Sequence, residues 1–329
     1  MTVIWAGIIA FAVVAYVVMD GFDLGIGMLF PRLRVGEERD SAMNSIAPVW
    51  DGNETWLVMG GGGLLAAFPL AYAIVLPALY APLTAMLLGL VLRGVAFEFR
   101  WRESNHRAAW DLAFTTGSLV ATFAQGITLG ALLQGITVEG RAYAGGWWDW
   151  LTPFSLVTGL SLCVGYALLG ACWLVMKAEG ELQDRAFALA RPLCVAMIVA
   201  ISLVSAATPF LEGQYYQRWF AWPGLLVTVP MPLLVLGVGW MLWRSLGRRQ
   251  ERAPFLWVLS LFGLCFIGLA ISIWPDAIPG RVTIWQAAAP EKSQIFMLVG
   301  ASVLVPLILA YTAWSYWVFR GKVGSHGYH

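Results

Sequence analysis

Apolar stretches long enough to cross a membrane follow one another along almost the whole chain. A transmembrane helix needs about 20 mainly apolar residues to cover a hydrocarbon core of roughly 30 Å. Charged positions divide the sequence into nine such stretches, which cover approximately residues 3–29, 50–72, 74–99, 111–135, 153–176, 190–210, 220–243, 254–274 and 295–319. This pattern predicts an all-α integral membrane protein with nine transmembrane helices.

The connections between the nine stretches carry basic residues mainly on alternate sides. Fifteen of the 20 Lys and Arg residues fall in connections on the same side as the C-terminus. The five exceptions are Arg93, inside the third stretch, and Arg141, Arg218, Arg281 and Lys292, on the opposite side. Because positive residues are retained in the cytoplasm, we expect a periplasmic N-terminus and a cytoplasmic C-terminus.

The composition supports membrane insertion and excludes other classes of protein. Hydrophobic residues make up 60% of the chain and charged residues 12%, against about 25% charged residues in a typical globular chain. The 18 Trp residues fit a protein with aromatic rings at both membrane interfaces. A net charge of +1 provides no basic field for nucleic acid.

The longest predicted external segment divides the chain into two unequal halves. It runs from Gln134 to Thr152 and contains three Trp residues and a Gly-Gly turn. Residues 1–140 are expected to form a first four-helix bundle with an acidic cluster. Residues 141–329 are expected to form a second bundle plus a ninth helix, which act as a scaffold.

Histidine and cysteine are too few, and too poorly placed, for a metal site within the membrane. Haem and copper sites in membranes generally use imidazole ligands. The three histidines are His106, in a cytoplasmic connection, and His326 and His329, in the C-terminal tail. The four cysteines lie in apolar stretches without a CxxC pair and are interpreted as packing residues: Cys163, Cys172, Cys194 and Cys265. We therefore expect no metal and no haem bound directly by this chain.

Ionisable residues inside the apolar stretches are concentrated in one part of the predicted molecule. Each costs about 2.5 to 3.5 kcal/mol at a helix centre, so it usually faces a partner or a watery cavity. All of those singled out fall on the cytoplasmic side of the first four predicted helices. They are Asp20, Asp23, Asp51, Glu54, Arg93, Glu98 and Asp111.

The spacing of these residues suggests two acidic helix faces opposite one cation. Asp20 and Asp23 are three residues apart, as are Asp51 and Glu54, so each pair shares a helix face. Two such faces around Arg93 would suit a proton relay.

A simpler interpretation is that several of these residues are ordinary helix-end charges. Asp51 and Asp111 lie where acidic residues favour a helix N-terminus. Glu98 could pair with Arg102 one turn further on. Glycines at positions 21, 25, 27 and 60–63 would permit close helix contact or a local break.

Five short strings follow one another in the first part of the chain: DGFDLGIG at 20–27, NSIAP at 44–48, WDGNETW at 50–56, FPLAY at 68–72 and RGVAFEFR at 93–100. Taken in this order, they resemble subunit II of cytochrome bd-type quinol oxidases, including the cyanide-insensitive branch. The strings occupy the first hundred residues. The rest of the chain resembles the family mainly in length, helix number and the LLQG string at 132–135.

This resemblance implies a fold, a partner and a reaction. The family fold is two four-helix bundles plus one additional helix, paired with a subunit I that carries haems b558, b595 and d. The pair oxidises quinol and reduces O2 to water, taking protons from the cytoplasm without pumping, in the bacterial inner membrane. A structural quinone or phospholipid, and a small single-helix subunit, could complete the complex.

The resemblance also assigns roles to individual residues. Asp51 matches the acidic residue at the mouth of a hydrophilic channel that leads to the haems. Trp50, Asn53 and Trp56 match a neighbourhood that contacts the haem subunit. Glu54 departs from the pattern, because many relatives have Gln at this position, so we expect it to assist proton uptake without being obligatory.

Two alternatives differ from the oxidase interpretation in class. A proton-coupled secondary transporter would also use buried carboxylates and broken helices. Its substrate site, however, is expected near the membrane midplane, and not on one side of one half. A purely structural subunit would tolerate neutralisation of the acidic residues without loss of activity.

Overall fold

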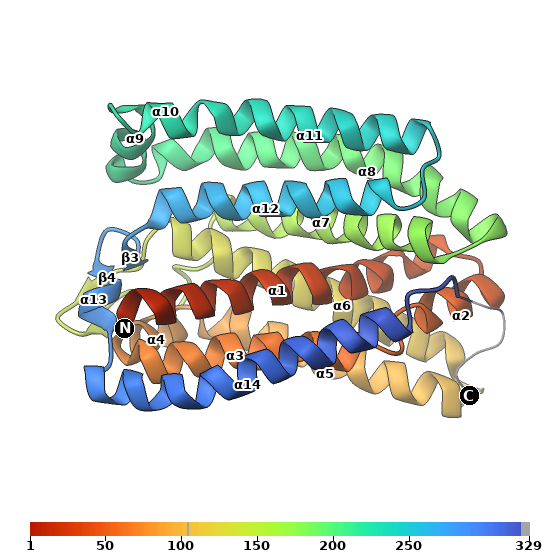
Figure 1. The fold of residues 1–329 in the computed structure, drawn as a ribbon, viewed down its shortest axis with the longest axis horizontal. Helices are drawn as coiled ribbons and strands as arrows, with labels where there is room; N and C mark the ends of the chain where they lie inside the picture. The colour runs from red at the N-terminus through yellow and green to blue at the C-terminus, as the bar shows by residue number, and fades with distance from the viewer. Residues whose placement is uncertain (104, 324–329) are drawn as a thin grey trace.

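Long helices, aligned with one axis, form most of the computed structural model, which describes residues 1–103 and 105–323, apart from the side chain of Val227 (Figure 1). The long helices are α1 (Thr2–Leu29), α3 (Trp50–Ala67), α5 (Tyr80–Arg102), α6 (Arg107–Leu133), α7 (Pro153–Lys177), α8 (Gly180–Ala207), α11 (Pro230–Gly247), α12 (Ala253–Ile273) and α14 (Glu291–Val318). Shorter helices are η1 (Phe30–Arg32), α2 (Glu37–Asn44), α4 (Pro69–Ala78), η2 (Thr208–Phe210), α9 (Gly213–Phe220), α10 (Leu225–Thr228) and α13 (Ile284–Ala287).

Only two small antiparallel hairpins interrupt the helices in the described part of the chain. Strand β1 (Val138–Glu139) pairs with β2 (Ala142–Tyr143), and β3 (Asp276–Ile278) pairs with β4 (Val282–Thr283). Together with α9, α10 and α13, both hairpins lie at the same end of the molecule as the N-terminus (Figure 1).

Seven helices among the described residues are long and apolar enough to cross a membrane: α1, α5, α6, α7, α8, α12 and α14. The span of α1 includes η1, and the span of α8 includes η2. The bent pair α3 and α4 raises the number to eight if it is one span. This confirms the all-α, multi-pass membrane class. A long helix also lies in each of the nine predicted stretches, but α11 is not among the candidate spans. Nine spans, and their orientation in the membrane, remain predictions.

The second predicted stretch, 50–72, is not one helix. Helix α3 ends at Ala67, and α4 continues at 120° to it. Phe68 precedes a proline and adopts a non-helical backbone, and Pro69 has no N–H to continue the ladder of hydrogen bonds. The break therefore lies at Phe68, whereas α3 runs uninterrupted through the glycines at 60–63.

The seventh predicted stretch, 220–243, begins too early. Residues 221–229 form a turn and the short helix α10, and the long helix α11 begins only at Pro230. Proline is well accepted in the first turn of a helix, where its missing N–H has no partner in any case. Apolar composition alone did not distinguish this irregular segment from the helix that follows it.

The helices of the two halves pack into one continuous core. Helices α1, α3, α5 and α6 are neighbours, α7, α8, α11 and α12 are neighbours, and α14 packs against α1 and α3. Helix α7 also contacts α1 and α6, and buried side chains from both halves belong to the same hydrophobic cluster. The division between residues 140 and 141 therefore separates bundles that share an interface.

Two glycines permit the closest contact between the halves. A Cβ atom added to Gly25 on α1 would lie 1.9 Å from the backbone oxygen of Tyr166 on α7. One added to Gly170 would lie 2.6 Å from the backbone of Gly25. Only hydrogen fits at either position, so small residues let the two helices cross backbone to backbone.

Candidate functional site

The acidic residues of α1 lie at the centre of the first four helices. Asp20 and Asp23 are both 0% exposed, and their spacing of three residues directs them to one face of the helix. A buried ionised carboxylate is costly unless it is paired or hydrogen-bonded. The two carboxyls meet this requirement in different ways.

Asp20 is paired with Arg93, the arginine inside the third predicted stretch. The Arg93 guanidinium on α5 lies 2.8 Å from an Asp20 carboxylate oxygen and also forms an ion pair with Glu54 on α3. The Arg93 side chain is 1% exposed, and its guanidinium lies 5.6 Å from the ring centre of Trp50. Three helices thus contribute to one buried ionic triad.

Asp23 has an amide partner in place of a cation. The Asn53 side-chain amide donates to an Asp23 oxygen at 2.7 Å and to the Met19 carbonyl at 3.2 Å. The Tyr316 hydroxyl on α14 donates to the Asn53 oxygen at 2.9 Å. The second Asp23 oxygen is buried without a hydrogen-bond partner in the described part of the structure.

Asp20, Asp23, Glu54 and Arg93 are called the acidic cluster below. Three carboxyls share one guanidinium, so the cluster carries a net charge of −2 when all three are ionised. The guanidinium interacts electrostatically with each of the three. Burial disfavours uncompensated charge, so this arrangement favours binding of a proton by one of the carboxyls.

A row of uncharged polar side chains continues from the acidic cluster into the middle of the bundle. Tyr16 lies one helical turn before Asp20 and interacts with it electrostatically. The Gln125 amide on α6 donates to the Tyr16 hydroxyl at 2.8 Å. The Tyr166 hydroxyl on α7 in turn donates to the Gln125 oxygen at 2.9 Å.

Asp51 lies outside the acidic cluster but next to it along α3. It is exposed, and it shares a helix face with Glu54, whose side chain is 28% exposed. Exposure therefore falls from Asp51 through Glu54 to the fully buried Asp20. Of the predicted polar group, Asp20, Glu54 and Arg93 are joined by ion pairs, and Asp51 lies three residues from Glu54 on the same helix.

Asp111 belongs to a different network. It forms ion pairs with Arg100 and, at 2.7 Å, with Arg39. Arg100 also lies 2.8 Å from Asp40, which Arg107 contacts at 3.2 Å. These pairs tie α2 to α5 and α6, so Asp111 fastens the connections at this end of the molecule and is separate from the acidic cluster.

Glu98 is also separate from the acidic cluster. Its carboxylate lies 3.7 Å from Arg102, four residues further along α5, and both side chains are largely exposed. This is the simple helix-surface pair that the spacing allowed.

The three residues predicted to contact a haem subunit differ in exposure. Trp50 is partly exposed, whereas Asn53 and Trp56 are both 1% exposed within this chain. The two buried side chains are already covered by this chain's own helices. Within this chain only Trp50 of the three has exposed surface, and contact of all three with a haem subunit stays a prediction.

Several polar residues of this region were not identified from the sequence. Tyr16, Gln125, Tyr166 and Tyr316 are uncharged and do not interrupt an apolar stretch. Gln125 carries the clearest signal, because an amide inside an apolar span needs an interhelical partner. Arg100 was counted among the loop cations, although it is 1% exposed.

The described residues contain no group of three or more His, Cys, Asp or Glu side chains arranged to hold a metal ion. His106 lies at an exposed connection beside Glu103. His326 and His329 lie outside the described residues. The absence of haem from this chain stays a prediction.

The apolar helices and the ionisable groups buried between them define a multi-pass membrane protein of the all-α class. The family model for cytochrome bd terminal oxidase subunit II matches residues 1–319. The chain therefore belongs to the cytochrome bd terminal oxidase subunit II family, as the strings in its first hundred residues indicated.

Known proteins similar to this chain agree with the family match. Cytochrome bd-I ubiquinol oxidase subunit 2 of Escherichia coli K12 is 32% identical, over 97% of this chain and 94% of the relative. Cytochrome bd ubiquinol oxidase subunit 2 of Bacillus subtilis 168 is 29% identical, over 98% and 96%. A chain of the bd oxidase from Geobacillus thermodenitrificans has the same fold, with a TM-score of 0.76, 18% identity and coverage of 98% and 99%.

Proposed function

We propose that this chain is the haem-free subunit II of a quinol oxidase and provides its cytoplasmic proton-uptake path. In this account a subunit I carries haems b558, b595 and d, where quinol is oxidised and O2 is reduced to water. The reaction is electrogenic because the protons consumed in forming water come from the cytoplasm, and no further protons are pumped. The present chain also stabilises subunit I.

The observation that carries the proposal is the fall in exposure along a series of neighbouring charged side chains. Asp51 lies at the surface, Glu54 is partly exposed and paired with Arg93, and Asp20 is fully buried on the other side of that guanidinium. A proton that binds at the surface would pass from Asp51 to Glu54 on the same face of α3, and Glu54 is already linked to the buried Asp20 through Arg93.

The charge of the acidic cluster explains why protons would accumulate there. With three ionised carboxyls the cluster has an uncompensated charge of −2, and each proton bound removes one of these charges. Asp23, with an amide partner but no direct cation, is the carboxyl that burial most favours in its neutral form. Tyr16 and Gln125 offer the next hydroxyl and amide groups beyond Asp20.

The basic connections support a location of this cluster on the cytoplasmic side. Arg34, Arg185 and Arg249 lie at the end of the molecule that also holds α2, where each forms an ion pair with an acidic residue. The positive-inside rule assigns this end to the cytoplasm. Nine spans, with the α3–α4 pair and α11 each crossing once, would then leave the N-terminus in the periplasm.

A proton-coupled transporter is less well supported. Transporter sites are typically formed where broken helices expose backbone groups near the midplane. Here the break at Phe68 is at the opposite end of α3 from Asp51 and Glu54. No broken helix end therefore lines the acidic cluster among the described residues.

Steady-state oxygen consumption by the purified complex tests the proposed path. We expect Asp51→Asn to slow quinol-dependent oxygen consumption at full haem content, and Glu54→Gln to slow it less. Glu98→Gln is the matched control, because it removes a carboxylate from the same end of the molecule outside this series. Its turnover is expected to equal that of the wild type.

Three outcomes would contradict the proposal. Unchanged turnover in Asp51→Asn and in the Asp51→Asn, Glu54→Gln double variant would exclude the path through α3. Equal slowing by Glu98→Gln would show a general effect of surface charge. Loss of haem together with activity would indicate that the acidic residues serve assembly.

A further inference from the structure

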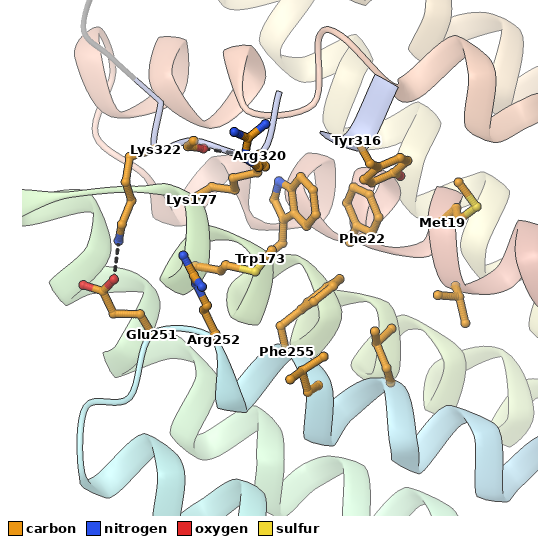
Figure 2. A pocket seen from close by; sticks show the side chains of 15 residues that line it. Met19, Phe22, Trp173, Lys177, Glu251, Arg252, Phe255, Tyr316, Arg320 and Lys322 are labelled. Carbon is orange, nitrogen blue, oxygen red and sulfur yellow. Dashed lines mark hydrogen bonds and ion pairs between the residues drawn. The ribbon is translucent and has the colours of Figure 1, made fainter. Parts of the chain in front are cut away.

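A mainly apolar pocket opens at the basic end of the molecule, between α1, α7, α12 and the end of α14 (Figure 2). Its volume is about 760 Å³. The acidic cluster does not line it, and the proton path proposed above makes no use of it.

Aromatic rings from four helices form the floor of the pocket. The Trp173 ring stacks on Phe22, with centroids 4.1 Å apart and planes within 11°. Phe255 meets the edge of Trp173 at 5.4 Å, and Tyr316 lies 6.2 Å from it (Figure 2). Methionine and aliphatic side chains complete an apolar lining, so the interior suits a hydrocarbon chain and not a polar solute.

Basic side chains surround the mouth of the same pocket. Lys177, Arg252, Arg320 and Lys322 line it together with a single acidic residue, Glu251. These five residues lie at helix ends: Lys177 ends α7, Arg252 precedes α12, and Arg320 and Lys322 follow α14. The mouth therefore lies at the level expected for lipid headgroups.

Not all of this positive charge is free for a ligand. Lys322 forms a 2.9 Å ion pair with Glu251, visible in Figure 2, and its hydrogen bond holds the pKa of that carboxyl below the usual value. The Lys177 ammonium donates to the backbone oxygens of Phe319 and Gly321.

The two guanidiniums are much less engaged. Arg252 is exposed and makes no side-chain hydrogen bond or ion pair to any described residue. Arg320 donates only to the Trp317 carbonyl, at 2.6 Å, and lies over that ring. Both guanidiniums thus keep free N–H groups at the mouth, and these match the oxygens of a phosphate.

We propose that this pocket binds an anionic phospholipid, with its phosphate at Arg252 and Arg320 and an acyl chain along Phe22, Trp173 and Phe255. Basic pockets between membrane helices on the cytoplasmic side suit acidic lipid headgroups. Phe22 lies about 10 Å below the end of α1, at a rise of 1.5 Å per residue, so headgroup and chain contacts are separated along the membrane normal as in a lipid. A neutral quinone would leave the cationic mouth without a counter-charge.

Native mass spectrometry of the delipidated complex, titrated with phosphatidylglycerol or phosphatidylcholine, tests the site. We expect the wild type to bind phosphatidylglycerol in preference. The double variant Arg252→Gln, Arg320→Gln is expected to lose affinity by at least about tenfold, since each guanidinium contributes charge-assisted hydrogen bonds. The control, Arg32→Gln with Arg248→Gln, removes two exposed cations at the same end outside the pocket and is expected to bind as the wild type does.

Three results would overturn the proposal. Equal binding of the two lipids would show that charge does not select the occupant. Equal affinity in the double variant and the control would place the lipid elsewhere. Denaturing the native complex could instead release a quinone and no phospholipid. If the double variant released no quinone, the ligand of this pocket would be a quinone. Haem content and oxygen consumption, measured on every sample, show that each variant is assembled.

Discussion

Arg93 holds the acidic cluster together at the scale of single residues. It is buried beside two carboxylates from two other helices, and removing one partner of a buried ion pair leaves an uncompensated charge. The Arg93 side chain therefore has a structural role that is separable from proton transfer by the carboxyls around it.

Arg93→Leu is expected to destabilise the assembled complex by about 3 to 5 kcal/mol, because Asp20 and Glu54 would lose their shared cation. Thermal unfolding of the purified complex, followed by loss of haem absorbance, measures the change. Arg102→Leu is the matched control on the same helix, since its exposed pair with Glu98 contributes little. Unfolding of both variants at the wild-type midpoint would contradict this role.

Residue spacing predicted part of the site. It placed Asp20 with Asp23 and Asp51 with Glu54, because helix faces follow directly from sequence separation. It could not assign Asp111 to the Arg39 and Arg100 network, since that pairing depends on how the connections fold back. Tyr16, Gln125 and Tyr166 are uncharged, so they do not stand out inside an apolar stretch of the sequence.

The crossing of α1 and α7 is the critical contact at the scale of elements. Gly25 and Gly170 let the two backbones meet, and this contact joins the helix that carries Asp20 and Asp23 to the second half of the chain. Close packing of this kind tolerates added volume poorly.

Gly25→Ala is expected to push α1 from α7 and to cost about 1 to 3 kcal/mol or more, since the new methyl group would meet the Tyr166 backbone. The thermal unfolding midpoint of the complex measures this cost. Gly7→Ala adds the same methyl group to the same helix where no other atom lies within 4 Å. Equal midpoints for the two variants would show that the crossing tolerates the added methyl group.

Element boundaries were predicted less well than element type. Hydropathy identified helical segments correctly, because apolar length is a direct requirement of the bilayer. It missed the break at Phe68 and the irregular residues 221–229, where proline acts on the backbone while the composition stays apolar. The two glycines of the α1–α7 crossing differ from other glycines only in what faces them.

At the scale of the whole molecule, charge is separated between the two ends. One end collects α2 and the ion pairs of the basic connections, and the other carries the two hairpins and the N-terminus (Figure 1). Alternation of basic residues predicted this separation, since consecutive membrane helices must return their connections to opposite sides. The chemistry of the complex could be inferred only through the resemblance to a family.

A reduced-minus-oxidised spectrum tests the division of labour between the subunits. The chain copurified with its native partners is expected to show haem absorbance, and the chain purified alone is expected to show none, because its described residues offer no intramembrane histidine. Haem retained by the isolated chain would contradict the assignment of all haem to subunit I. A complex without haem would contradict the oxidase function.

Proton uptake during a single reaction of the fully reduced complex with O2, followed with a pH-indicator dye, tests the central claim most directly. In Asp20→Asn, at full haem content, we expect uptake to slow by at least about tenfold, the effect of a barrier raised by about 1.4 kcal/mol. Glu98→Gln should take up protons at the wild-type rate. Uptake at the wild-type rate in Asp20→Asn would contradict a path through the acidic cluster.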